Sequence, residues 1–174
     1  MTDAQDEGTK QGNGEAGGAA AQGGTPRLAI LAQYVKDLSF ENPQGPAAFA
    51  QPGQRPEIQV RVDVRGEEKG RGQQEIILEL VVEAKLEDRP VFLLELAYGG
   101  LFALENVPAS EAGDLLMVEG PRLLFPFARR LIADLTAEGG FPPLLLGPID
   151  FLSLHRRRMA RRAAAGGTPP AAQA

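Results

Sequence analysis

Every second residue is apolar between Ile58 and Val64, and this period of two constrains the fold more than any other feature of the chain. Successive side chains of a β-strand point to opposite faces, so the alternation predicts a strand with one apolar and one polar face. Residues 75–86 alternate in the same way, residues 90–104 are apolar on both faces, and residues 33–41 alternate loosely. We therefore expect four strands of an antiparallel sheet, because such a sheet can leave one face wet.

The link between the first two strands predicts their arrangement. Residues 42–56 are rich in proline and glycine and are too long for a hairpin, so we expect a crossover connection rather than a tight turn. Gly99 and Gly100, inside the fourth strand, indicate a bulge or a close approach of another backbone.

Helical spacing of apolar residues begins in the second half of the chain. A short helix is expected at residues 115–118, ending before Pro121, and a longer one at residues 121–138 with a bend at Pro126. A proline-stiffened apolar arm follows Gly139-Gly140. Because the strands come first and the helices second, the fold class is predicted to be α+β, with a four-stranded antiparallel sheet, a crossover loop and helices packed on one face.

The composition divides the chain into three parts. Residues 1–26 contain almost no apolar side chain except alanine, so they are expected to form a disordered tail. Residues 27–155 are expected to form the folded domain. Residues 156–174 are expected to form a basic helix end and a flexible tail, because arginines gather between Arg156 and Arg162 without nearby acids. Two interpretations of these arginines remain open. They could contact an acidic or anionic partner, or they could form a solvated helix end.

The sequence contains little that could carry catalysis. There is no cysteine and one histidine, His155, so the usual zinc sites and a cysteine nucleophile are excluded, and no phosphate-loop or hydrolase motif occurs. Glu95 lies among apolar residues and could be either an acid catalyst or an exposed strand residue. The net charge of −5 argues against nonspecific nucleic-acid binding, and no apolar run is long enough to span a bilayer. We expect a cytoplasmic protein that is not an enzyme and needs no cofactor or metal.

Three segments carry a resemblance to a known family. The stretches YVKDLSFENP (residues 34–43), FLLELAYGGLF (residues 92–102) and LLFPFARRLIADLTAEGGFPPLLLGPIDF (residues 123–151) resemble SecB, the bacterial protein-export chaperone. The likeness covers residues 28–155. It implies a homotetramer built as a dimer of dimers, which binds unfolded precursor proteins without ATP and delivers them to SecA, the translocase motor.

The resemblance also implies roles for individual residues. Contact with SecA is expected at Asp37, Glu41, Leu93 and Glu95. The client groove is expected to include Phe49, Val60, Phe141 and Leu144. The oligomer interface is expected to depend on Leu94, Leu96, Tyr98, Leu124, Ala128 and Leu131.

This chain departs from the family pattern in three places. Gln54-Arg55 stand before Pro56-Glu57, where family members often carry a tryptophan. Ala97-Tyr98 precede Gly99-Gly100 where polar residues are common, and the chain from Arg156 to Arg162 is basic where acidic tails are expected. Two alternatives to an export chaperone are a SecB-like chaperone that controls a toxin–antitoxin pair and a small-ligand-binding α+β protein.

Overall fold

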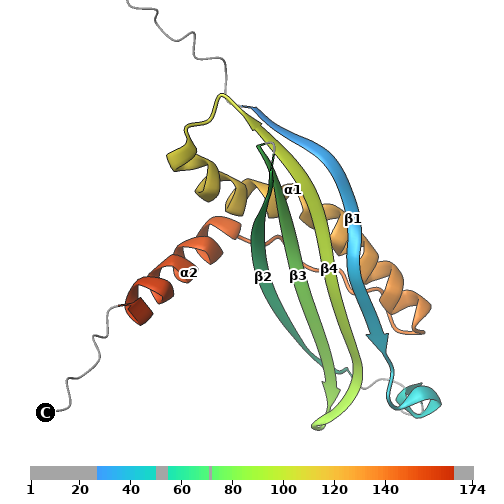
Figure 1. Cartoon of the computed structure of the whole chain (residues 1–174). Coiled ribbons are helices and arrows are strands. Elements are labelled where there is room, and N and C mark those ends of the chain that lie inside the picture. The colour runs from blue at the N-terminus through green and yellow to red at the C-terminus, as the bar shows by residue number, and fades with distance from the viewer. Residues whose placement is uncertain (1–26, 50–54, 71, 167–174) are drawn as a thin grey trace, which may run out of the picture.

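A computed structural model describes residues 27–49, 55–70 and 72–166, and the predicted tails, residues 1–26 and residues 167–174, lie outside this part. A four-stranded antiparallel sheet lies on one side of two helices (Figure 1). Its strands are β1 (Arg27–Glu41), β2 (Glu57–Gly70), β3 (Gln73–Leu86) and β4 (Arg89–Glu105). The other elements are the short 3-10 helix η1 (Gly45–Phe49), α1 (Ala109–Glu138) and α2 (Phe151–Gly166). The predicted α+β fold class is confirmed.

The strand order confirms the predicted crossover. The strands lie in the order β1-β4-β3-β2, so consecutive hairpins join β2, β3 and β4, while β1 pairs with β4 at the opposite edge from β2. The link after β1 therefore has to pass from one edge of the sheet to the other. The turn between β3 and β4 places Glu87 and Asp88 at φ of 49° and 65°, the left-handed region that a two-residue hairpin requires at both positions.

The core lies between α1 and one face of the sheet. In β3 and β4 this face is formed by the even-numbered residues, which the strand register places opposite one another, as for Leu80 and Leu96. The most deeply buried members from the strands and α1 are Ile76, Leu78, Leu80, Val82, Ala84, Leu94, Leu96, Phe102, Leu116, Leu124, Ala128 and Ile132. The alternation in residues 75–86 therefore predicted the core face of β3 correctly.

Gly99 and Gly100 provide the predicted close approach. A Cβ atom on Gly100 would lie 2.7 Å from Leu124 Cδ2 of α1, and one on Gly99 would lie 2.7 Å from the Tyr34 ring on the other face. The register of β4 continues through both glycines, and the irregularities in this pair of strands occur around Leu31 and Lys36 in β1. The glycines therefore let a helix and an aromatic ring approach β4 from opposite sides.

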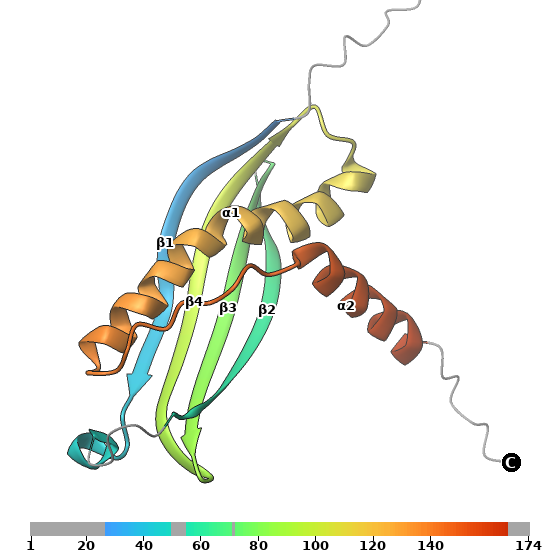
Figure 2. The ribbon, with the colours of Figure 1, turned by 180° about the vertical axis from the view of Figure 1, so that it is seen from behind.

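The predicted break before Pro121 is wrong. Residues 109–138 form one continuous helix of 30 residues, which contains both Pro121 and Pro126 and runs diagonally across the sheet (Figure 2). Interior prolines cost about 3 kcal/mol in an isolated helix, but tertiary packing can offset this cost. Gly120 packs closely against Ile76, where an added Cβ atom would lie 3.0 Å from Ile76 Cγ1, and Pro121 is itself buried.

Candidate binding surfaces

The four residues predicted to contact SecA lie together on the sheet face away from α1. The register pairs Glu41 with Leu93 and Asp37 with Ala97, and it places Glu95 opposite Ser39, between these two pairs. Directly opposed residues share one face of a sheet, so the acidic side chains of β1 and β4 form neighbouring rows. Asp37, Glu41 and Glu95 are exposed and Leu93 is half-buried. We call these four residues the acidic patch.

A shallow hollow adjoins the acidic patch. Asp37 and Glu95 line it together with Asp63, Glu79 and Arg61 from β2 and β3. Arg65 pairs with Glu79 and Arg158 pairs with Asp63. Asp37 and Glu95 make no ion pair within the described part of the chain, and these two carboxylates favour a cationic partner by electrostatic attraction. Glu95 is exposed on this face, as its strand-residue interpretation predicts.

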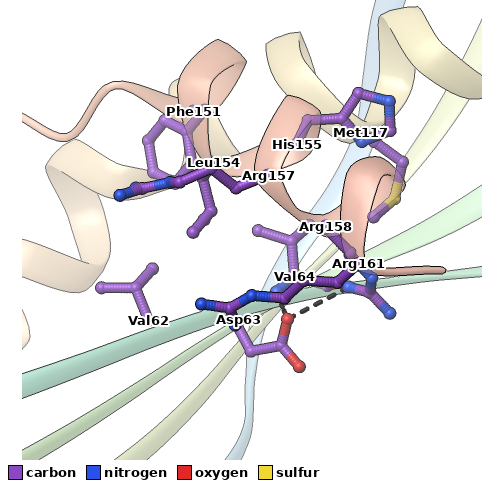
Figure 3. A pocket seen from close by; sticks show the side chains of 10 residues that line it. All are labelled: Val62, Asp63, Val64, Met117, Phe151, Leu154, His155, Arg157, Arg158 and Arg161. Carbon is purple, nitrogen blue, oxygen red and sulfur yellow. Dashed lines mark hydrogen bonds and ion pairs between the residues drawn. The ribbon is translucent and has the colours of Figure 1, made fainter. Parts of the chain in front are cut away.

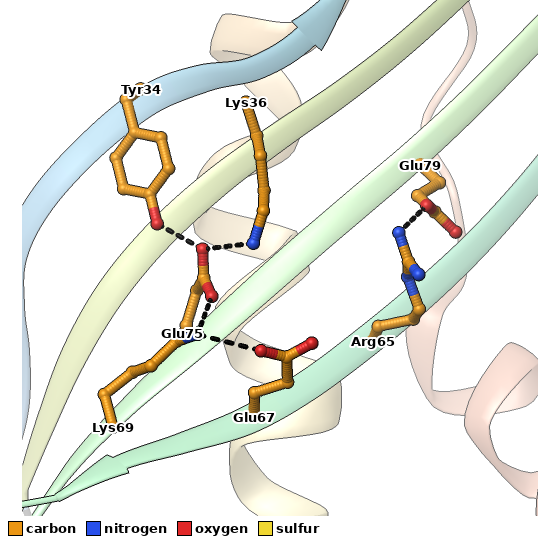
Figure 4. Close-up of polar contacts among 7 residues, drawn as sticks. All are labelled: Tyr34, Lys36, Arg65, Glu67, Lys69, Glu75 and Glu79. Atoms are coloured by element: carbon orange, nitrogen blue, oxygen red, sulfur yellow. Dashed lines mark hydrogen bonds and ion pairs between the residues drawn. The ribbon is translucent and has the colours of Figure 1, made fainter.

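An ion cluster around the buried Glu75 carboxylate lies on the same face, nearer the hairpin of β2 and β3. The Glu75 carboxylate accepts hydrogen bonds from the Tyr34 hydroxyl and from Lys36 Nζ at 2.8 Å, and Lys69 Nζ lies 2.7 Å from its second oxygen (Figure 4). Lys69 also pairs with Glu67 at 2.8 Å. The hydrogen bonds from Lys36, Lys69 and Tyr34 lower the pKa of Glu75 to about 2. Burial and the bond to Glu75 raise the pKa of Tyr34 to about 12. The cluster joins β1, β2 and β3, and sequence analysis did not find it because its partners are far apart in the chain.

An aromatic cluster lies on the α1-facing side of the sheet. The Phe141 ring lies 5.0 Å from Phe92 and 6.4 Å from Phe40 between centroids, and Phe40 and Phe92 stack at 5.7 Å. The sequence singled out Phe141 but not its two partners, although both belong to apolar strand positions. Phe49 ends η1, and its side chain lies outside the part that the structure describes.

Apolar side chains near this cluster stay exposed on the same face. Val60 is 39% exposed and Ile58 is 36% exposed, because α1 covers β3 and β4 but leaves this end of β2 open (Figure 2). Leu144 is half-buried on the arm after α1, and its neighbour Leu145 is 69% exposed. Three of the four predicted groove residues, Val60, Phe141 and Leu144, therefore present apolar surface on the helix-covered side.

The Thr136 side chain is one of the groups that attach the arm to α1, together with the Thr136 carbonyl, which accepts the Phe141 N–H at 3.0 Å. Gly140, at φ of 85°, reverses the chain where α1 ends, as the Gly139-Gly140 pair predicted. Thr136 is fully buried, and its Oγ1 donates to the Ile132 carbonyl and accepts the Leu144 N–H, both at 2.9 Å. This relay holds residues 141–144 against the helix and so positions Phe141 and Leu144.

The residues predicted for the oligomer interface are mostly core residues. Leu94, Leu96 and Tyr98 of β4 and Leu124 and Ala128 of α1 are all buried within one protomer, so their side chains do not form an outer contact surface. Leu131 is half-buried. The outward row of α1 contains Leu123 and Phe127, spaced four residues apart, and Phe127 is 50% exposed. An effect of the five buried residues on assembly would have to act through the packing of the protomer.

Comparison with known proteins gives the family. The model of a family described as preprotein translocase subunit SecB matches residues 21–162. The chain belongs to the SecB family. Protein-export protein SecB of Afipia carboxidovorans is 49% identical over 138 residues, which cover 79% of this chain and 86% of that protein. Protein-export protein SecB of Parvibaculum lavamentivorans is 47% identical over 154 residues, covering 88% and 90%. The chain is therefore a SecB chaperone of preprotein export, and the predicted resemblance is confirmed.

A solved structure supports the fold independently. The chain superposes on a Mycobacterium tuberculosis SecB-like chaperone, solved in complex with a ChAD peptide from an antitoxin, with a TM-score of 0.60 at 15% identity, covering 71% of this chain and 91% of that one. At this identity the likeness shows the fold alone. None of the helices in the described part of this chain is both long and apolar enough to cross a membrane.

Proposed function

We propose that this SecB protein is a cytoplasmic, ATP-independent holdase that binds unfolded secretory precursors, keeps them competent for translocation and delivers them to SecA. It acts as a homotetramer and catalyses no reaction. The observation that carries this proposal is the separation of two surfaces. Exposed apolar side chains, including Val60 and Leu145, lie on the helix-covered side of the sheet, and the acidic patch lies on the opposite face.

The apolar side suits an unfolded client. An unfolded chain presents apolar side chains, and burying them against Ile58, Val60 and Leu145 removes surface from water without requiring a particular sequence. Each such contact is weak, but several copies of the surface in one oligomer bind a long chain much more tightly through effective concentration. Low sequence specificity with high overall avidity is what a general export chaperone needs.

The client surface can be tested with a matched pair of charge insertions. Val60 and Gln59 are adjacent on β2 and point to opposite faces of the sheet. We expect Val60→Asp to weaken suppression of aggregation of a reduced, unfolded precursor, measured by light scattering without ATP, while Gln59→Asp leaves it near the wild-type level. Wild-type protein that fails to slow aggregation would overturn the holdase proposal, and equal activity of both variants would overturn the placement of the client surface.

The acidic patch is proposed as the SecA contact. Its carboxylates, exposed and clustered on β1 and β4, would attract a basic segment of the motor protein. We expect Asp37→Lys with Glu95→Lys to abolish SecA binding in titration calorimetry while client binding persists. Glu111→Lys with Glu138→Lys, which makes the same charge change on exposed positions of α1, is the control. Unchanged SecA affinity in the patch variant contradicts the assignment.

The outward row of α1 is proposed as the contact between dimers. Leu123 is 38% exposed and Phe127 is 50% exposed, and Leu131 continues their four-residue spacing. Contiguous exposed apolar side chains of this kind mark contact surfaces between proteins. We expect Leu123→Asp with Phe127→Asp to reduce the native mass from that of a tetramer to that of a dimer, whereas Arg130→Asp, at another exposed position of α1, does not. A wild-type protein that is monomeric in native mass spectrometry contradicts the proposed tetramer.

Control of a toxin–antitoxin pair is the less favoured function. The antitoxin peptide belongs to the mycobacterial SecB-like chaperone, whose identity to this chain is 15%, whereas the relatives above 45% identity are named for protein export. Export therefore remains the proposed role.

A further inference from the structure

The C-terminal helix covers one end of the apolar side of β2. Val62 and Val64 follow Val60 on the same face of the strand, and they line a pocket of about 490 Å³ together with Met117 of α1 and Phe151 of α2 (Figure 3). A pocket of this size is within the range of about 300–1,000 Å³ typical of ligand sites. Val62 and Val64 thus carry the apolar surface of β2 from the exposed Val60 to beneath α2.

Three arginines of α2 line the same pocket, and one of them holds the helix in place. Arg158 Nη1 donates to Asp63 Oδ1 at 3.0 Å and to the backbone carbonyl of Val64. Asp63 Oδ1 also accepts the Val64 N–H at 2.8 Å. Among the described residues, Asp63 is the only carboxylate that lines the pocket, and its ion pair with Arg158 matches its charge.

The other two guanidinium groups have no acidic partner among the residues that the structure describes. Arg157 and Arg161 line the pocket and make no ion pair with any residue in the described part of the chain. Figure 3 shows the Arg157 guanidinium between Phe151 and Val62, and it shows the Arg161 side chain next to Asp63. A guanidinium group binds a carboxylate through two parallel hydrogen bonds, and it does so more strongly next to apolar surface than in open water.

We propose that this pocket is an acidic subsite of the client surface, in which Arg157 and Arg161 bind a carboxylate of an extended client segment whose apolar neighbours lie along β2. The inference rests on the proposed holdase function and adds a chemical preference to it. An extended chain advances about 3.3 Å per residue. If apolar side chains of the client pack on Val60 and Val62, an acidic side chain a few residues further along the client lies near the two arginines. The occupant is thus an unfolded segment in which an Asp or Glu follows an apolar stretch.

The test compares two labelled peptides and two double variants of the full chain. The peptides share one alternating apolar sequence and end in either Glu or Gln at the same position. Arg157→Gln with Arg161→Gln removes the two unpaired pocket charges. Arg156→Gln with Arg162→Gln removes the same charge from the same helix at exposed positions that do not line the pocket. Dissociation constants are measured by fluorescence anisotropy at low and moderate salt.

We expect the wild-type protein to bind the Glu peptide about fivefold to tenfold more tightly than the Gln peptide, the range for one or two partly exposed charge pairs. The pocket variant should lose this ratio, and the control variant should retain most of it. Equal affinity for the two peptides, or an equal loss in both variants, overturns the inference. Duplex DNA or polyphosphate that displaces the Glu peptide as readily as a second acidic peptide also overturns it, in favour of a general anion site. If neither peptide binds, the holdase proposal itself fails, so the two failures are distinguishable.

Discussion

The Thr136 hydroxyl binds the backbone of the arm after α1 at Leu144, and replacing it tests how the client surface is positioned. In Thr136→Val the side chain keeps its shape, but the Leu144 N–H loses the acceptor that lies 2.9 Å away. A buried donor left without an acceptor costs about 1–3 kcal/mol. Leu144 is only half-buried, so water can reach part of the site after a small movement, and we expect a loss of about 1.5 kcal/mol.

The expected consequence is local as well as global. The arm should detach more often, so the Leu144 amide should exchange with deuterium about tenfold faster, and client affinity should fall because Phe141 and Leu144 are no longer held in place. Urea unfolding at a fixed protomer concentration measures the free energy, since oligomerisation links stability to concentration.

The control is Thr136→Ser, which keeps the hydroxyl and removes one methyl group. This variant loses packing energy of about 1 kcal/mol, yet it should preserve protection of the Leu144 amide because the acceptor remains. Amide exchange therefore separates the hydrogen bond from the packing. Unchanged exchange of Leu144 in Thr136→Val, or equal acceleration in both variants, would refute the reasoning.

Two further predictions concern the sheet. Gly100→Ala should destabilise the protein by about 1–3 kcal/mol in urea unfolding, because its Cβ atom would lie 2.7 Å from Leu124 Cδ2. The control is Gly113→Ala, in an open part of α1, which should stabilise the protein by about 0.5–1 kcal/mol. A Gly100→Ala variant as stable as the wild type would contradict the close packing. The Glu75 carboxyl has its pKa lowered from 4.5 to about 2, so its stabilising contribution is present above pH 4.5 and is lost as the pH falls toward 2. Acid unfolding curves of Glu75→Gln should therefore be flatter over this interval, and curves parallel to the wild type would contradict a stabilising role for the cluster.

Much of the acidic patch was predictable because strand geometry is regular. Asp37 and Glu41 are an even number of residues apart, which places them on one face wherever the strand lies. Strand pairing decides the rest of the patch. Because β1 pairs with β4, the register places Glu95 between Asp37 and Glu41 along the strands. Here the resemblance to SecB supplied what a single sequence cannot, because pairing between strands more than fifty residues apart leaves no local pattern.

The residues predicted for the oligomer interface show what a local pattern leaves open. Leu94, Leu96 and Tyr98 are apolar strand residues, and no local pattern tells whether α1 of the same chain or another protomer covers them. The structure places all three beneath α1. Leu123 and Phe127 are exposed on α1, whose apolar residues cover a wide face of the helix. Spacing alone therefore could not separate the exposed row of apolar residues from the buried row.

The sequence by itself determined the four strands, the crossover, the reversal after α1 and the SecB family, because each depends on local periodicity, on turn residues or on motifs within one segment. Only the tertiary structure decided that α1 continues through Pro121, that Thr136 holds the arm, and that α2 places unpaired arginines beside β2. Each of these depends on contacts between segments distant in the chain. The energy of such contacts can outweigh a local preference of a few kcal/mol, and a single sequence does not record where they form.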